Sequence, residues 1–275
     1  LPCREEQLME QNTPSLVILS TTDLMLAALL IVLLALLSRF NQNGLEKRML
    51  FASVRATLQL LLIGVVLQTL FDHINLFWIA MLSLLMILLA GREVEARQQY
   101  RIEGGWGFFS GTFAMFLSSM VTTLFGLLVI IQYDPWYHPQ YAIPLLGMLL
   151  GNTMNGISLG MDRLTSSVWQ QRKQIDARLA LGERAADAIR VLRNEAIRTG
   201  MIPILNAMAA AGLISLPGMM TGQILSGTPP LEAVKYQLLI LFLISAGTGF
   251  GVMAAIAISS RKFFDERERL RTERI

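Results

Sequence analysis

The sequence predicts an all-α, polytopic membrane protein. Apolar residues make up 53% of the 275 residues and charged residues only 16%, whereas a soluble domain carries about 25% charge. The apolar residues also occur in continuous Leu-rich runs, and about 20 such residues span a bilayer. Backbone groups in hydrocarbon must bond within their own segment, so these runs are expected to be helices. A β-barrel would need short strands of alternating polarity, which continuous runs exclude.

The apolar runs predict seven transmembrane helices in a single domain, residues 1–275. The expected spans are 19–38, 50–71, 75–91, 108–131, 141–161, 202–224 and 236–259. Residues 1–18 are polar and are expected to form an external tail. They do not resemble a cleaved signal, which would begin with basic residues and end at a small-residue cleavage site.

The basic residues predict the orientation of the spans. Of the 23 Lys and Arg residues, 20 fall in segments that seven spans would place on one side. Those segments are 39–49, 92–106, 162–201 and 260–275. Cytoplasmic segments carry the Lys/Arg excess, so we expect the N-terminus outside and the C-terminus in the cytoplasm. The cytoplasmic tail, 260–275, is expected to be a solvated helical extension of the last span.

The sequence lacks the motifs of several enzyme classes. It contains no G-x-x-x-x-G-K-[ST] or H-E-x-x-H pattern. Its single cysteine, Cys3, excludes an internal disulfide and a cysteine-based metal site. His73 and His138 fall in short external loops and are not expected to be transport ligands. We therefore expect a non-enzymatic chain with no cofactor of its own and no nucleic-acid partner.

The cytoplasmic loop 162–201 carries the strongest candidate for a partner-binding segment. It holds the run Asp176-Ala177-Arg178-Leu179-Ala180-Leu181-Gly182. This run resembles the E-A-A-x-x-x-G loop with which ABC importer permeases dock on their ATPase, except that Arg178 replaces the second Ala. Small residues allow close approach, and Gly permits a positive φ at the helix end. We predict that Asp176, Ala177, Arg178, Leu181 and Gly182 couple the chain to an ATPase; an ordinary solvated helical hairpin is the alternative.

Polar residues and a helix break inside the spans are candidates for a transport pathway. Polar groups are costly in a membrane and often functional. Pro removes a helix hydrogen bond and Gly loosens the next turn, so carbonyls can face a cavity, and broken helices often line transport pathways. A packing kink is the alternative. The candidates for the pathway are Asn152, Asn155, Asn206, Pro217, Gly218, Met219 and Met220.

Two further polar residues, Arg55 and Gln59, lie in the second expected span and are candidates for a structural or gating role. Arg55 is close enough to the cytoplasmic surface to snorkel. G-x-x-x-G pairs allow helix backbones to approach closely, which favours packing within the bundle, with a homodimer seam as the alternative. These pairs are Gly107/Gly111, Gly147/Gly151, Gly156/Gly160, Gly218/Gly222 and Gly247/Gly251.

Several segments resemble one known family, the FetB-type iron-export permeases. They include Gly151-Asn152-Thr153-Met154, the stretch from Leu213 to Gly222 and Ala233-Val234-Lys235-Tyr236-Gln237. The resemblance covers about residues 20–265, and plant permeases linked to aluminium tolerance are similar. It implies an ABC-type permease that pairs with a separate ATP-binding subunit, which holds ATP and magnesium. It also implies two copies of each chain and export of iron across the bacterial inner membrane.

The expected function is therefore that of a permease subunit in an ATP-driven exporter of iron. The residues that would bind a metal are unknown, although oxygen donors suit a hard or borderline cation, and the scarcity of His and Cys argues against a tight zinc or copper site. One alternative is an exporter or flippase of an organic solute, such as a nucleotide sugar or a lipid. Another is a partner-independent secondary carrier, for which Asp23 is the only acid within the spans.

Overall fold

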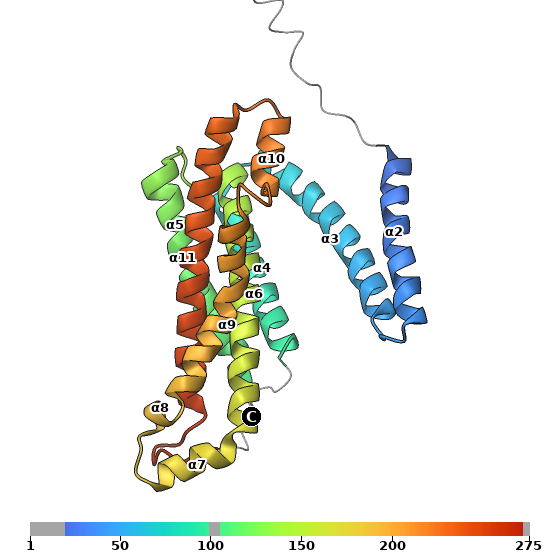
Figure 1. The fold of residues 1–275 in the computed structure, drawn as a ribbon. Helices are drawn as coiled ribbons and strands as arrows, with labels where there is room; N and C mark the ends of the chain where they lie inside the picture. Colours follow the sequence, from blue (N-terminus) through green and yellow to red (C-terminus); the bar gives the residue numbers. More distant parts are fainter. Residues whose placement is uncertain (1–19, 99–104, 272–275) are drawn as a thin grey trace, which may run out of the picture. The chain divides into compact units, whose positions relative to one another are not determined.

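In the computed structural model, residues 20–98 and 105–271 are described, and they are helical apart from the connecting loops (Figure 1). The predicted external tail, 1–18, lies outside the described residues. Over the described ranges there is no β-strand, only isolated bridges, so the all-α prediction is confirmed. The helices are α2 Thr21–Phe40, α3 Glu46–Asp72, α4 Leu76–Ala96, α5 Trp106–Phe125, the π-helix η2 Gly126–Ile131, α6 Pro139–Gln170, α7 Arg172–Ala180, α8 Ala185–Ala188, α9 Arg190–Ala210, α10 Gly218–Leu225 and α11 Pro230–Lys262.

Six helical stretches in the described residues are long and apolar enough to cross a membrane: α2, α3, α4, α5 with η2, α6 and α11. The predicted span 202–224 is not one of them, because it is not one helix. Its first part belongs to α9, which begins in the charged segment at Arg190 and ends at Ala210. The chain becomes helical again only at Gly218. The count of seven spans and the orientation therefore remain predictions.

The chain divides into two compact units, Leu1–Ile74 with Gly222–Pro229 and Asn75–Thr221 with Pro230–Ile275. The first unit contains α2 and α3, which pack against each other. Ser20 and Asp23 form a capping box at the start of α2, because each side chain accepts a hydrogen bond from the other residue's backbone N–H. Asp23 therefore has a local structural role at this helix end.

The second unit is a bundle in which α6 packs against α4, α5, α9 and α11. Its helices approach closely at glycines. A Cβ on Gly200 would lie 2.7 Å from the carbonyl oxygen of Gly156, and one on Gly251 would lie 2.6 Å from Cγ2 of Thr153. The pairs Gly156/Gly160 and Gly247/Gly251 thus serve packing within this unit, as small residues do in membrane bundles.

The bundle continues past the predicted end of the fifth span at 161, since α6 extends to Gln170. The chain then turns through α7 and α8 into α9. Buried Ile175 and Ile189 join the main core cluster of this unit, together with Phe263 from the tail. The described part of the tail is not the helical extension that the sequence predicted. Helix α11 ends at Lys262, because Phe263 is fully buried and turns the chain back.

Candidate functional site

The predicted coupling segment ends α7 in a glycine-closed turn. Gly182 has φ +87°, its N–H donates to Leu179 O at 3.0 Å, and the N–H of Glu183 donates to Arg178 O at 3.1 Å. This pair of bonds is the Schellman motif, which satisfies the last carbonyls of a helix and favours Gly at the left-handed position. The glycine is therefore required by the turn itself.

Arg178, which departs from the E-A-A-x-x-x-G pattern, joins α7 to α8. Its Nε lies 3.2 Å from a carboxylate oxygen of Glu183, and its guanidinium donates to Ala188 O at 3.0 Å. The sequence placed Arg178 in the coupling segment but gave no indication of this second contact. The only local signal is the pairing of opposite charges across Gly182.

Helix α7 is buried at Ile175, whereas the coupling segment that follows this residue is mostly exposed. Ile175 is buried, whereas Asp176, Ala177 and Leu181 are exposed, and 88% of the Leu181 surface is accessible. A hollow of 470 Å³ lies beside the segment, bordered by Ala177 and Arg178 from α7 and by residues of α8 and α9. Leu181 does not border this hollow, and a single exposed leucine is common on protein surfaces, so the coupling role of the segment stays a prediction.

Two of the predicted pathway residues share a face of α6, because positions 152 and 155 are one helical turn apart. Asn155 accepts a hydrogen bond of 2.7 Å from Arg97, at the end of α4, and Arg97 also lies 3.9 Å from Glu93. The side chain of Asn152 donates to Met148 O in its own helix. Both asparagines are exposed on the second unit. Arg97, which sequence reasoning did not assign, thus belongs to the same polar group.

Asn206 is exposed on α9, and no recorded bond joins it to either of these asparagines. Farther toward the end of α6, Arg163 forms an ion pair of 3.2 Å with Glu195 of α9. Arg55 and Gln59 are exposed on α3, which belongs to the first unit. Within the second unit, the predicted polar residues that the structure describes are therefore not joined into one hydrogen-bonded group.

The interruption between α9 and α10 differs from the one that the sequence predicted. The chain leaves α9 at Ala211, where Gly212 adopts φ +88° and donates to Ser215 O at 2.9 Å. Ser215 in turn donates to Ala210 O, and Thr221 donates to Pro217 O. Pro217 stands just before α10, where its fixed φ suits a helix start. Gly212 ends the helix, and these carbonyls already have hydrogen-bond donors.

The last residues to be placed are Met219, one of the pathway candidates, and the two histidines, which were not expected to be transport ligands. Met219 is half-buried against the second core cluster. His138 stands at the start of α6 with its ring 5.0 Å from that of Tyr133, and His73 follows the end of α3. Among the described residues there is no group of three or more His, Cys, Asp or Glu side chains that could hold a metal ion.

The fold and its long apolar helices define a multi-pass α-helical membrane protein. The chain belongs to the Uncharacterised protein family (UPF0014), whose family model matches residues 21–264. The predicted membrane location is confirmed, and so is the resemblance to the FetB-type permeases and their plant relatives.

Three relatives illustrate the range of the family. The chain is 38% identical to "UPF0014 membrane protein slr1647" of Synechocystis sp. over 82% of this chain and 87% of the relative. It is 30% identical to "Probable iron export permease protein FetB" of Escherichia coli over 92% and 95%. It is 33% identical to "Protein ALUMINUM SENSITIVE 3" of Arabidopsis thaliana over 90% and 88%. No solved structure matches the chain.

Proposed function

We propose that this chain is the permease subunit of an ATP-driven, ABC-type exporter that moves iron out across the bacterial inner membrane. The observation that carries the proposal is the exposed, glycine-closed segment Asp176–Gly182 in a multi-pass membrane chain. Iron is the preferred cargo because a relative that covers most of both chains is named a probable iron export permease.

The proposal includes seven membrane crossings, with the N-terminus outside and the C-terminus in the cytoplasm. Six crossings correspond to the long apolar helices, and the seventh combines the apolar half of α9 with the interruption and α10. Interrupted helices are tolerated at membrane depth where protein or a water-filled cavity surrounds them. The Lys/Arg distribution supports this arrangement, since it puts α7, α8 and the tail on the cytoplasmic side.

The proposed partner is a separate ATP-binding subunit that carries ATP and magnesium, with two permeases and two ATPases in the complex. Leu181 is the apolar anchor for this subunit, because a large apolar side chain at the tip of a charged hairpin gains most from burial in a partner. Basic residues precede and follow it in the sequence, including Lys173, Arg178 and Arg184. The complementary partner surface is an apolar pocket with an acidic rim.

The proposed pathway uses weak oxygen and sulfur donors rather than a tight metal site. Asn152, Asn155 and Asn206 supply amide oxygens, and Met219 and Met220 supply thioethers. Weak binding suits transport, because the cargo has to leave again. Arg97 at Asn155 would repel a cation from that point until the hydrogen bond between them opens, so we assign this pair to the gate.

Two measurements test the proposal. Tagged permease should co-purify an ATP-binding subunit, and the reconstituted complex should show ATP hydrolysis that iron stimulates. Failure to recover an ATPase would contradict the ATP-driven mechanism. Stimulation by an organic solute instead of a metal would overturn the cargo assignment.

The docking segment is tested with substitutions at Gly182. Gly182→Pro removes the N–H that closes the turn and cannot adopt the required positive φ, so it should abolish recovery of the ATPase. Gly182→Asn is the matched control, because Asn tolerates the left-handed conformation. If Gly182→Pro still recovers the ATPase and transports normally, the docking assignment is wrong.

A further inference from the structure

Helix α8 begins without a capping side chain of its own. Its first residue, Ala185, follows Arg184, and an arginine side chain can only donate hydrogen bonds. The missing acceptor comes from the tail, since Glu268 Oε2 accepts from the N–H of Ala185 at 3.1 Å. A carboxylate is favoured at this end of a helix, where unpaired N–H groups carry partial positive charge.

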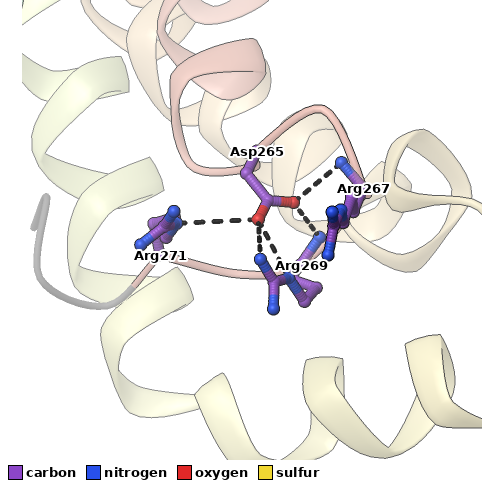
Figure 2. Close-up of polar contacts among 4 residues, drawn as sticks. All are labelled: Asp265, Arg267, Arg269 and Arg271. Carbon is purple, nitrogen blue, oxygen red and sulfur yellow. Dashed lines mark hydrogen bonds and ion pairs between the residues drawn. The ribbon is translucent and has the colours of Figure 1, made fainter.

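Glu268 belongs to a tightly bonded turn, Phe263–Arg271, which we name the tail turn. Figure 2 shows the contacts of Asp265 within this turn. Backbone bonds close it, from Arg271 N to Phe263 O at 2.8 Å and from Asp265 N to Arg269 O at 3.1 Å. Asp265 fills its centre. One carboxylate oxygen accepts from the N–H of Arg267 and of Arg269, and the other lies 2.9 Å and 3.7 Å from the guanidinium groups of Arg269 and Arg271.

Apolar side chains also place the tail turn in the same core cluster as residues of α7 and of the segment after α8. Phe263 is fully buried in the same core cluster as Ile175 and Ile189, and Phe264 and Leu270 pack against that cluster. Beside this contact a cavity of 340 Å³ separates part of α8 and α9 from α11 and the tail turn, and Glu268 is among the residues that line it. The Glu268–Ala185 bond is therefore a polar link across an incompletely filled contact.

We propose that the tail turn transmits the movement of the ATPase-docking segment to α11, and that Glu268 is the positioning residue of this link. This inference rests on the proposed function. A docked ATPase would move α7 and α8, and Glu268 would carry that movement to the helix that packs against α5, α6 and α9. Coupling then requires a tail contact that the E-A-A-x-x-x-G pattern does not contain.

The link itself is tested in the permease alone, without a partner. Glu268→Ala removes the acceptor, whereas Glu268→Gln keeps an oxygen that can accept from Ala185. We expect amide hydrogen exchange in residues 185–189 to be about tenfold faster in Glu268→Ala, the effect of losing one charge-assisted hydrogen bond. Glu268→Gln and the control Glu266→Ala, on the same turn, should exchange as the unaltered chain does. Equal exchange in all variants would overturn the link.

The role in coupling is tested in the complex reconstituted with its ATPase in lipid vesicles. Glu268→Ala should still bind the ATPase but move several times less cargo for each ATP hydrolysed, and Glu268→Gln should restore the ratio. Normal coupling in Glu268→Ala, or an equal loss in Glu268→Gln, would overturn the inference. Gly182→Pro tests docking separately. If docking depends on Gly182 but Glu268→Ala leaves coupling unchanged, this inference is wrong and the proposed function is not affected.

Discussion

Gly251 is a residue at which the interior of the second unit has little room for a side chain. A Cβ there would lie 2.6 Å from Thr153 Cγ2 and 2.8 Å from Ser118 Oγ, on two different helices. Thr153 is fully buried and β-branched, so its methyl has little freedom to turn away and the helices would have to move apart. Close packing of three helices therefore depends on the absence of one methyl group.

We predict that Gly251→Ala destabilises the bundle by about 1–3 kcal/mol, the usual cost of overpacking a well-filled core. Gly151→Ala is the matched control, because no atom of the second unit lies within 4 Å of a Cβ at that position. It should be neutral or stabilising, since Ala is the better helix former. Thermal unfolding of both variants in detergent is the measurement, and equal stability would show that the α5–α6–α11 contact is loose.

Asp265 provides a second test at the level of one side chain. The backbone N–H of Arg269 lowers the pKa of its carboxyl below the ordinary aspartate value, and bonds from the Arg269 side chain and the Arg267 N–H lower it further, against the opposing effect of burial. Because the pKa is depressed in the folded state, the charged carboxylate stabilises the turn at any pH above the ordinary aspartate pKa. That stability is lost only as the pH falls through the lower, folded-state pKa.

We therefore predict that the tail turn stays closed from neutral pH down to the ordinary aspartate pKa and opens in stronger acid. A spin label at position 266, introduced as Glu266→Cys with Cys3→Ser, should become mobile only in that acidic range. In Asp265→Asn, the mobility of the label should depend less on pH, because the amide of Asn does not titrate. Release of the label near neutral pH would mean that Asp265 does not hold the turn.

At the scale of helices, the interruption between α9 and α10 is the clearest departure from a simple span. Its tip exposes Leu213 and Ile214, of which 95% and 84% of the surface is accessible. The backbone of the turn is nevertheless well bonded, through Gly212 N to Ser215 O and Ser215 N to Ala210 O. The interruption is therefore an ordered turn built around Gly212 rather than a kink imposed by Pro217.

This geometry changes the expected effect of substitutions. Pro217→Ala should leave the interruption in place and reduce export little, because the chain has already left α9 six residues earlier. Gly212→Ala should reduce export more, since a positive φ costs a residue with a Cβ about 1–2 kcal/mol. Cellular iron retention and membrane protein level, measured together, decide between them. Loss of export in Pro217→Ala with normal export in Gly212→Ala would reassign the break to the proline.

The helices were predictable from sequence because apolar runs report directly on burial in a bilayer. Their ends and the tail were not. Helix α6 continues beyond 161 because Leu164 and Val168 still have core to pack against. The tail looked solvated because charges outnumber its apolar residues, yet Phe263 and Leu270 decide its path. Glu268 capping Ala185 could not be found locally, since the two residues are 83 positions apart.

At the scale of the whole molecule, the number of membrane crossings decides whether the proposed function agrees with the distribution of Lys and Arg. Six crossings would put both ends of the chain on the same side. They would also put α7 and the loop between α10 and α11 on one side, although only the first of these is rich in Lys and Arg. Seven crossings separate them, which satisfies the charge bias. The broken α9–α10 segment is therefore the element on which the topology depends.

We predict that α7 and the loop after α10 face opposite sides of the membrane. In a Cys3→Ser background, Ser226→Cys should react with a membrane-impermeant thiol reagent applied from outside. Lys173→Cys and Glu266→Cys, both at exposed positions, should react only after the membrane is permeabilised. If Ser226→Cys and Lys173→Cys react from the same side, α9 and α10 do not cross, and the interrupted segment is re-entrant. In that case α11 would carry Glu266 to the side opposite Lys173, and the tail turn could not reach α8.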